Sequence, residues 1–183
     1  MEKLSGIKDE FQAGRFLFGI MVLFLASSFA LSLLPLEWFE FFYAFLSLEA
    51  LKLAGLSGHI ELGEPVLIYL SAFTVPIGIS YLCTGLLELA LVWASVASSF
   101  GIEARKRAIG IAAGTAAIVV LNTARITASV LIIRFFGLDA GEFSHDILFR
   151  LFLVVTIAGF YYAWFAWATR EKKSEKFGKK KNG

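Results

Sequence analysis

The chain has 183 residues, of which 58% are hydrophobic and only 17% are charged. A soluble domain averages about 45–50% apolar and about 25% charged residues, so the composition excludes an ordinary water-soluble protein. The net charge is only +2, but lysine and arginine are concentrated in a few short segments.

Four long segments carry almost no charge and predict membrane-spanning helices. Segments 16–36 and 151–169 have no charged residue, 66–102 has only Glu88, and 108–133 has only one arginine. A helix needs roughly 20 apolar residues to cross a bilayer. The first segment exceeds the roughly 7–15 apolar residues of a signal peptide, so we expect it to be retained. The sequence predicts an all-α polytopic membrane protein, a single domain (1–183) built as a bundle of four helices.

The basic residues predict the orientation of this bundle. Thirteen of the 17 lysines and arginines lie in 1–15, in EARKR at 103–107 and in the tail 170–183. Because such clusters flank the cytoplasmic ends of spans, we place all three segments inside, in contact with anionic lipid and not with nucleic acid. The protein is then a multi-pass plasma-membrane protein with both termini in the cytoplasm. Cys83 and His145 fall toward the extracellular face.

The segment 37–80 is interrupted by charges and is interpreted as a cap on the outer face. Residues 37–55 have helical character, but the eight uncharged residues between Glu40 and Glu49 are too few to cross the bilayer. GHIELGEPVLIYL at 58–70 alternates in its first half and breaks at GEP, as a hairpin does. We expect an amphipathic helix followed by a short hairpin or re-entrant segment. The alternative is two further crossings, six in all.

Arg125 is the hardest residue to explain as packing. A charge near the centre of a span costs at least about 2.5–3.5 kcal/mol on insertion scales, and Arg125 lies about 13 Å deeper than Arg134 at the outer interface. Asn122 shares its helix face. We expect Arg125 to line a polar cavity or to meet a carboxylate, with Glu88 as its natural partner. For Glu88 two interpretations stay open, an ion pair that only joins two helices or electrostatic support for a functional Arg125.

The single cysteine and the two histidines are the remaining reactive groups. Cys83 lies near the outer end of its segment, where it is either a small buried hydrophobe or a nucleophile. His145, with Asp146 beside it, opens the last span, and the alternative is a solvated or capping histidine. His59 is a competing imidazole on the same face. The topology predicts that a thiol, the Arg125 guanidinium and an imidazole meet at the outer end, an arrangement that favours acyl transfer.

The sequence gives no sign of a bound metal or cofactor. One cysteine and two histidines offer no metal-ligand spacing. A glycine-rich loop that could cradle phosphate is also absent, which argues against ATP-driven transport. We therefore expect neither a metal nor another cofactor.

Three short motifs, in this order, resemble the exosortase/archaeosortase family of integral-membrane cysteine transpeptidases. They are CTGL at 83–86, NTARI at 122–126, and His145 ahead of the last span. The first resembles the family's Cys-Ser/Thr-Gly-aliphatic signature, and the second its Asn-x-x-Arg-Ile signature. With the intervening helices, the resemblance covers roughly residues 56–168.

This resemblance implies a substrate and a mechanism. The substrates would be secreted proteins whose C-terminus carries a short sorting motif, a transmembrane helix and a basic cluster. Cys83 would form a thioester at the sorting motif, Arg125 would stabilise the oxyanion, and His145 would move protons between the leaving amine and the acceptor. Gly85 would let the substrate backbone approach, and Thr84 would offer an N–H and a hydroxyl near the thiol. The acceptor would be a lipid, another amine or water, and with water the protein would be a plain peptidase.

A non-enzymatic alternative is a small membrane scaffold or solute channel. In that case Glu88 and Arg125 form a purely structural pair. This alternative predicts that Cys83→Ala changes nothing measurable.

Overall fold

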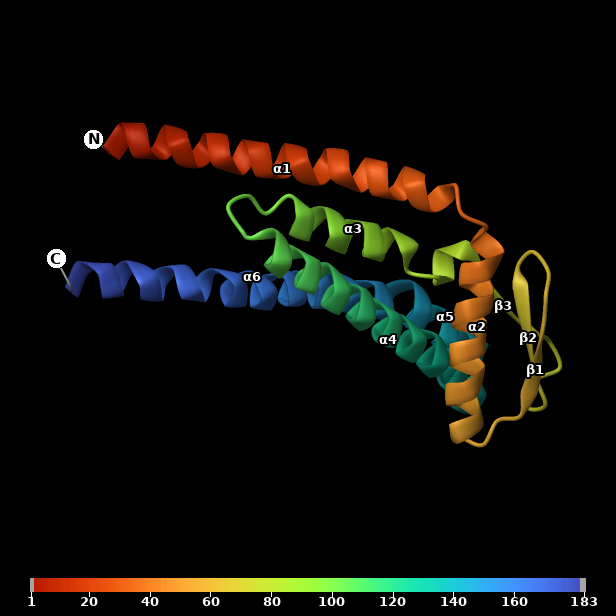
Figure 1. The fold of residues 1–183 in the computed structure, drawn as a ribbon. Helices are drawn as coiled ribbons and strands as arrows, with labels where there is room; N and C mark the ends of the chain where they lie inside the picture. Colours follow the sequence, from red (N-terminus) through yellow and green to blue (C-terminus); the bar gives the residue numbers. More distant parts are fainter. Residues whose placement is uncertain (1, 182–183) are drawn as a thin grey trace.

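Three long apolar helices dominate the computed structural model (Figure 1). It describes residues 2–181, apart from the side chains of 2–13, 146, 148–150 and 171–181. The helices are α1 (Glu2–Ser32), α4 (Ala104–Phe136) and α6 (Phe149–Lys181). Their apolar segments Gly14–Ser32, Ala104–Phe136 and Leu151–Arg170 are long enough to cross a bilayer. Three such helices in the described part of the chain indicate a multi-pass membrane protein.

Large apolar side chains cover the outward faces of these helices. On α1, for example, Phe18, Leu25 and Phe29 are more than 60% exposed, at 63%, 61% and 67%. Soluble monomers rarely expose continuous apolar surfaces of this kind. Lipid contact accounts for these exposed side chains.

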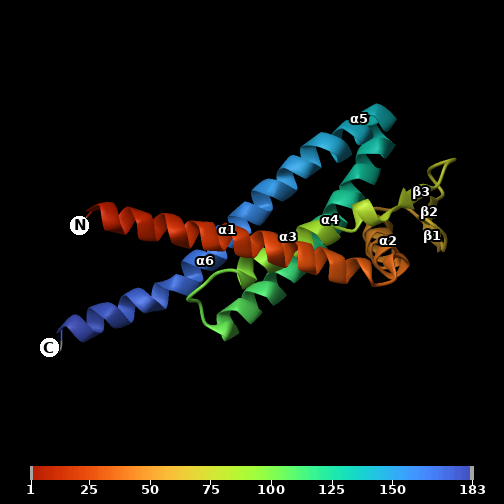
Figure 2. The same ribbon diagram turned by 90° about the horizontal axis from the view of Figure 1, so that it is seen from above.

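The predicted fourth span is shorter than expected. Helix α3 (Leu86–Ala97) has 12 residues, about 18 Å of helix against a hydrocarbon core of about 30 Å. It runs alongside α1, from the cap end to the loop that leads into α4 (Figures 1 and 2). The preceding residues form strands because Pro65 and Pro76 interrupt any helix and β-branched residues predominate around them. Four spans were predicted, and three helices of spanning length are found.

A cap covers one end of the helices, opposite to the start of α1 and the end of α6 (Figure 1). It consists of α2 (Leu36–Leu53), which runs across the helix ends, and an antiparallel sheet in the order β1-β2-β3. The strands are β1 (Gly58–Glu61), β2 (Val66–Leu70) and β3 (Ile77–Ile79). The third strand goes beyond the expected hairpin, so the fold is mostly helical and not all-α. The six-span alternative finds no support, because α2 carries four charged residues and is not among the helices apolar enough to cross a bilayer.

The cap has its own apolar core. Alternate side chains of β2 are buried against α2, whose buried residues recur every three or four positions as in an amphipathic helix. Two residues of α4, Ile126 and Val130, belong to the same cluster. The cap is therefore anchored on α4 at the level of the NTARI motif.

A second apolar cluster joins α3, α4 and α6. Its buried members are Leu89, Val92, Val96, Ile102, Ile118, Ile157, Trp164 and Ala168. At Gly114 of α4, a Cβ atom would lie 2.5 Å from Cγ1 of Val92, so glycine permits the close approach of α3 and α4. This packing fixes the first turn of α3 next to α4.

The chain returns from α4 to α6 through α5 (Leu138–Phe143) and a π-helical turn, η2 (Ser144–Leu148). Gly137, with φ +90°, ends α4. The η2 turn lies against α4 and carries His145 toward the cap end of the molecule. The side chains of the predicted tail beyond residue 170 and of the predicted N-terminal segment up to residue 13 lie outside the described residues.

Candidate functional site

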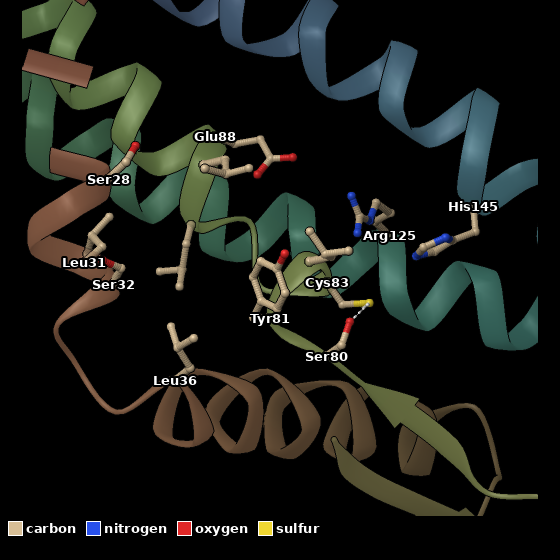
Figure 3. Close-up of a pocket in the computed structure, with 13 residues that line it drawn as sticks. Ser28, Leu31, Ser32, Leu36, Ser80, Tyr81, Cys83, Glu88, Arg125 and His145 are labelled. Atoms are coloured by element: carbon tan, nitrogen blue, oxygen red, sulfur yellow. Dashed lines mark hydrogen bonds between the residues drawn. The ribbon is translucent and has the colours of Figure 1, made fainter. Parts of the chain in front are cut away.

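A cavity of about 580 Å³ lies at the cap end of the helices. Its walls come from α1, the start of α2, the 3₁₀ turn η1 (Tyr81–Cys83), α3, α4 and η2, and leucine is the commonest residue in them. Four polar side chains predicted from the sequence line it: Cys83, Glu88, Arg125 and His145. Figure 3 shows the thiol, the guanidinium and the imidazole converging on one region of this cavity. Cys83 and His145, 62 positions apart in the chain, thus share one site.

Cys83 lies just before α3, and not inside a helix as expected. It is half-buried and ends η1, where its N–H donates to the carbonyl of Ser80 at 2.8 Å. The Ser80 hydroxyl lies 3.8 Å from Sγ, within hydrogen-bond range for sulfur. The turn therefore presents the thiol to the cavity together with a hydroxyl partner.

The surroundings of Cys83 favour its thiolate. Burial raises the pKa of the thiol, but hydrogen bonds with His145 and Ser80 and the charge of His145 together outweigh burial, so the pKa lies below its ordinary value. A lowered pKa and partial exposure are the features of a reactive cysteine. The hydrophobe interpretation does not predict this combination.

His145, and not His59, is the imidazole at the site. It is half-buried, lines the cavity and lowers the pKa of Cys83. His59 is exposed on β1 and stacks on Tyr69, with ring centroids 5.1 Å apart. Of the two histidines that the sequence left as candidates, His145 lies at the cavity and His59 does not. Asp146, predicted as its neighbour in the site, has a side chain outside the described residues.

Arg125 is buried, with 5% of its surface exposed, and lines the cavity. Among the described residues, its Nε atom has no hydrogen-bond partner. Glu88 lines the same cavity, but no ion pair joins the two side chains in the described part of the chain. The structural Glu88–Arg125 pair of the scaffold alternative is therefore not formed. A buried guanidinium without a carboxylate is costly and needs another explanation.

Asn122 holds the thiol-bearing turn in place. It is fully buried on α4, and its Nδ2 donates to the backbone carbonyl of Cys83 at 2.6 Å. Gly85 starts α3 with φ +68°, and a Cβ there would lie 3.2 Å from Cγ of Asn122. Glycine is thus needed for the left-handed turn and for this contact. Substrate approach, the reason inferred from the sequence, is not needed to explain it.

Thr84 uses both of its predicted donors within the turn. Its N–H and its hydroxyl both donate to the carbonyl of Tyr81, at 3.1 and 2.6 Å, and its side chain is fully buried. A donor that closes a 3₁₀ turn is not available to a substrate. Thr84 therefore shapes the turn and offers nothing to the cavity.

Two residues at the site were not predicted. Ser80 could have been suspected, since a hydroxyl three residues before a cysteine faces it in a turn. Tyr43 of α2 is 4% exposed and lies near Asn122, Glu88 and Arg125. Its signal was the three- and four-residue spacing of buried positions in α2. That pattern marks the inward face of the helix but not what the face meets.

No group of three or more metal-binding side chains occurs among the described residues. No family model matches the chain, and neither a curated protein nor a solved structure matches it. The geometry of the site is therefore the observation on which an assignment of function can be built.

Proposed function

We propose that the protein is a membrane-embedded cysteine transpeptidase, or protease, that cleaves the C-terminal sorting signal of secreted proteins. The observation that carries this proposal is the convergence of Cys83, His145 and Arg125 on one cavity (Figure 3), where His145 lowers the pKa of the Cys83 thiol. A thiol with a lowered pKa beside an imidazole is the arrangement required of an activated cysteine nucleophile. The three motifs shared with the exosortase/archaeosortase family suggest the substrate class.

In the first half of the reaction, His145 takes the proton of the Cys83 thiol, and Sγ attacks the carbonyl carbon of the scissile peptide bond. The C–N bond then breaks, a thioester to Cys83 remains, and the leaving amine takes a proton from His145. In the second half, His145 takes a proton from the acceptor, whose attack on the thioester releases the thiolate. A lipid or another amine as acceptor gives transpeptidation, and water gives a free carboxyl group.

Arg125 supplies positive charge where negative charge develops. Arg125 lines the cavity that also holds the thiol, where its guanidinium can bind the oxyanion of the tetrahedral intermediate. Charge stabilisation of this kind is usually the largest single contribution to catalysis. This role explains why the buried charge is retained despite its cost.

The volume and the leucine side chains of the cavity are compatible with a short apolar part of a substrate. Its volume of about 580 Å³ falls within the range of about 300–1,000 Å³ typical of small-ligand sites. Ser28 and Leu31 of α1 form part of the wall, and α1 contacts the remainder mainly through α3. A substrate helix in the bilayer has access to this side. From the positive-inside rule we infer that the cavity faces the extracellular side, since the basic clusters lie at the opposite end of the chain's helices.

The test uses a secreted protein with a sorting motif, a transmembrane helix and a basic C-terminal cluster, co-expressed with wild type or with Cys83→Ala. We expect loss of the substrate's C-terminal helix only with wild type, measured by intact mass. An added lipid mass identifies a transpeptidase, and a free carboxyl terminus identifies a peptidase. Identical unprocessed mass with both proteins, across several such substrates, would contradict the proposal.

A further inference from the structure

A second cavity, of about 460 Å³, lies at the end of α3 that is remote from the cap. Its walls come from α1, the loop between α3 and α4, and α6, three elements that lie side by side there (Figures 1 and 2). One arginine and four aromatic residues dominate its lining: Arg15, Phe16, Phe100, Tyr161 and Phe165. The proposed chemistry gives this cavity no role.

The cavity lies at the level where the membrane-spanning segments end. Arg15 directly precedes the uncharged segment 16–36. On α6, the exposed side chains Tyr162 and Trp167 flank Phe165 of the cavity in the chain. Tyrosine and tryptophan are enriched at the boundary between the hydrocarbon core and the lipid headgroups. The cavity therefore opens at the level expected for lipid phosphates.

Arg15 brings a positive charge to this cavity without a carboxylate to balance it. The side chain is exposed, and its guanidinium carbon lies 5.2 Å from the centroid of the Phe100 ring, a cation–π contact. No ion pair joins Arg15 to another described residue, and no acidic residue is among those that line the cavity. A guanidinium stacked on a ring keeps its N–H groups available to a phosphate.

The neighbouring cation, Lys106, is bound to the protein itself. It lines a smaller hollow of about 200 Å³ together with Glu103. Its Nζ donates to the carbonyl of Ala168 at 3.3 Å and lies 6.0 Å from the centroid of the Trp167 ring. A carboxylate and an ammonium that already has partners make this hollow a poor anion site. Arg15 is therefore the cation that an anion in the larger cavity meets.

Tyr161 joins the three walls of the cavity. Its hydroxyl lies 3.0 Å from the Ser99 hydroxyl at the end of α3, within hydrogen-bond distance. Its ring lies 6.1 Å, between centroids, from the ring of Phe16 on α1. A ligand bound in the cavity thus touches α1, α6 and the loop after α3 together, and it stabilises their packing.

We propose that this cavity binds the phosphate of one anionic phospholipid, with Arg15 as its cationic partner. The negative phosphate complements the unbalanced guanidinium, and the acyl chains lie against the apolar surface of α1 and α6. Basic pockets between membrane helices commonly bind anionic headgroups in this way. A soluble phosphate compound has the same charge but no apolar part, so it gains nothing from the aromatic walls.

The test measures thermal unfolding of the purified protein in detergent after a defined lipid is added. Phosphatidylglycerol, which is anionic, is compared with phosphatidylcholine of the same acyl chains and with glycerol 3-phosphate, which has no acyl chain. Arg15→Gln removes the cation. Arg105→Gln is the matched control, because Arg105 is exposed at the start of α4 but does not line the cavity.

We expect phosphatidylglycerol, at a hundredfold excess over its Kd, to raise the melting temperature of the wild type by about 5–10 °C, because it binds only the folded state. Phosphatidylcholine should give a clearly smaller rise, and glycerol 3-phosphate none. Arg15→Gln should lose most of the rise, and Arg105→Gln should keep it. Native mass spectrometry should show one phosphatidylglycerol bound to wild type and its loss from Arg15→Gln.

Four results would overturn the inference. No rise with phosphatidylglycerol would mean that the cavity binds no such lipid, and equal rises with both lipids would mean that charge plays no part. Equal losses in Arg15→Gln and Arg105→Gln would mean that the whole basic end attracts the lipid. An equal rise with glycerol 3-phosphate would identify a soluble ligand. None of these measurements uses a peptide substrate, so the result does not depend on the proposed function.

Discussion

The two ends of the helix bundle differ in how their buried polar side chains are hydrogen-bonded. At the end opposite the cap, the α3–α4 turn is held by donors that meet backbone carbonyls. Trp164 Nε1 donates to Lys106 O at 3.1 Å, and Arg107 Nη1 donates to Ala97 O at 3.1 Å. At the cap end, Arg125 Nε and Asn122 Oδ1 are buried without a hydrogen-bond partner among the described residues.

This difference distinguishes buried polar groups that stabilise the fold from buried polar groups that serve a function. Arg107 also has a buried Nε without a partner, but its Nη1 satisfies a carbonyl at the end of α3, where a positive charge is favourable. Arg125 sits in the middle of α4 and stabilises no helix end. Buried polar groups left unpaired at one place in a fold are expected at functional sites.

Of the substitutions that test this comparison, Arg125→Met should have the largest effect. The cost of burying an unpaired charge disappears, so the melting temperature should be unchanged or higher. Substrate processing should fall by about 100- to 1,000-fold, as when an oxyanion donor is removed. The measurements are thermal unfolding in detergent and intact-mass analysis of a co-expressed substrate. A lower melting temperature would show that the guanidinium stabilises the fold after all.

The matching substitution at the other end, Arg107→Met, should lower stability and leave substrate processing unchanged. It removes a charged hydrogen bond to Ala97 O and leaves that carbonyl unsatisfied, which costs about 2 kcal/mol. The melting temperature should fall by several degrees in a protein of this size. Processing, corrected for the amount of folded protein, should not change. Loss of processing at full stability would place a functional site at this end too.

Much of the architecture could be predicted because it depends on composition. Charge-free segments predicted α1, α4 and α6, and the charges between 37 and 80 predicted a cap. Two details depend on tertiary contacts and could not be predicted. The apolar segment before Cys83 forms a strand because α2 offers it an apolar face, and α3 starts late because Gly85 turns the chain against Asn122.

The sequence predicted which residues line the site, but not the distances between them. Cys83, Arg125 and His145 stood out because a thiol, a charge and an imidazole are unusual near spans. The missing Glu88–Arg125 pair and the two bonds of Thr84 to Tyr81 are decided by distances of an ångström or two. No spacing rule along the chain reports such distances.

The two histidines give a test within the cap end. His145→Ala leaves burial of Cys83 opposed only by Ser80, so the pKa of the thiol should rise. Less thiolate is then present at neutral pH, and alkylation by iodoacetamide should slow roughly tenfold. His59→Ala is the control, since His59 is exposed and stacks on Tyr69. Equal pH profiles for His145→Ala and wild type would remove His145 from the site.

Ser80→Ala should give the smallest effect, in the same direction. Its hydroxyl lies 3.8 Å from Sγ, a long contact to a weak acceptor, and it lowers the pKa of Cys83 less than His145 does. Alkylation at neutral pH should slow roughly twofold, the effect of a weak hydrogen bond. Ser95→Ala is a suitable control, because that hydroxyl donates only to Leu91 O within α3. If Ser80→Ala slowed alkylation more than His145→Ala, the hydroxyl and not the imidazole would be the main partner of the thiolate.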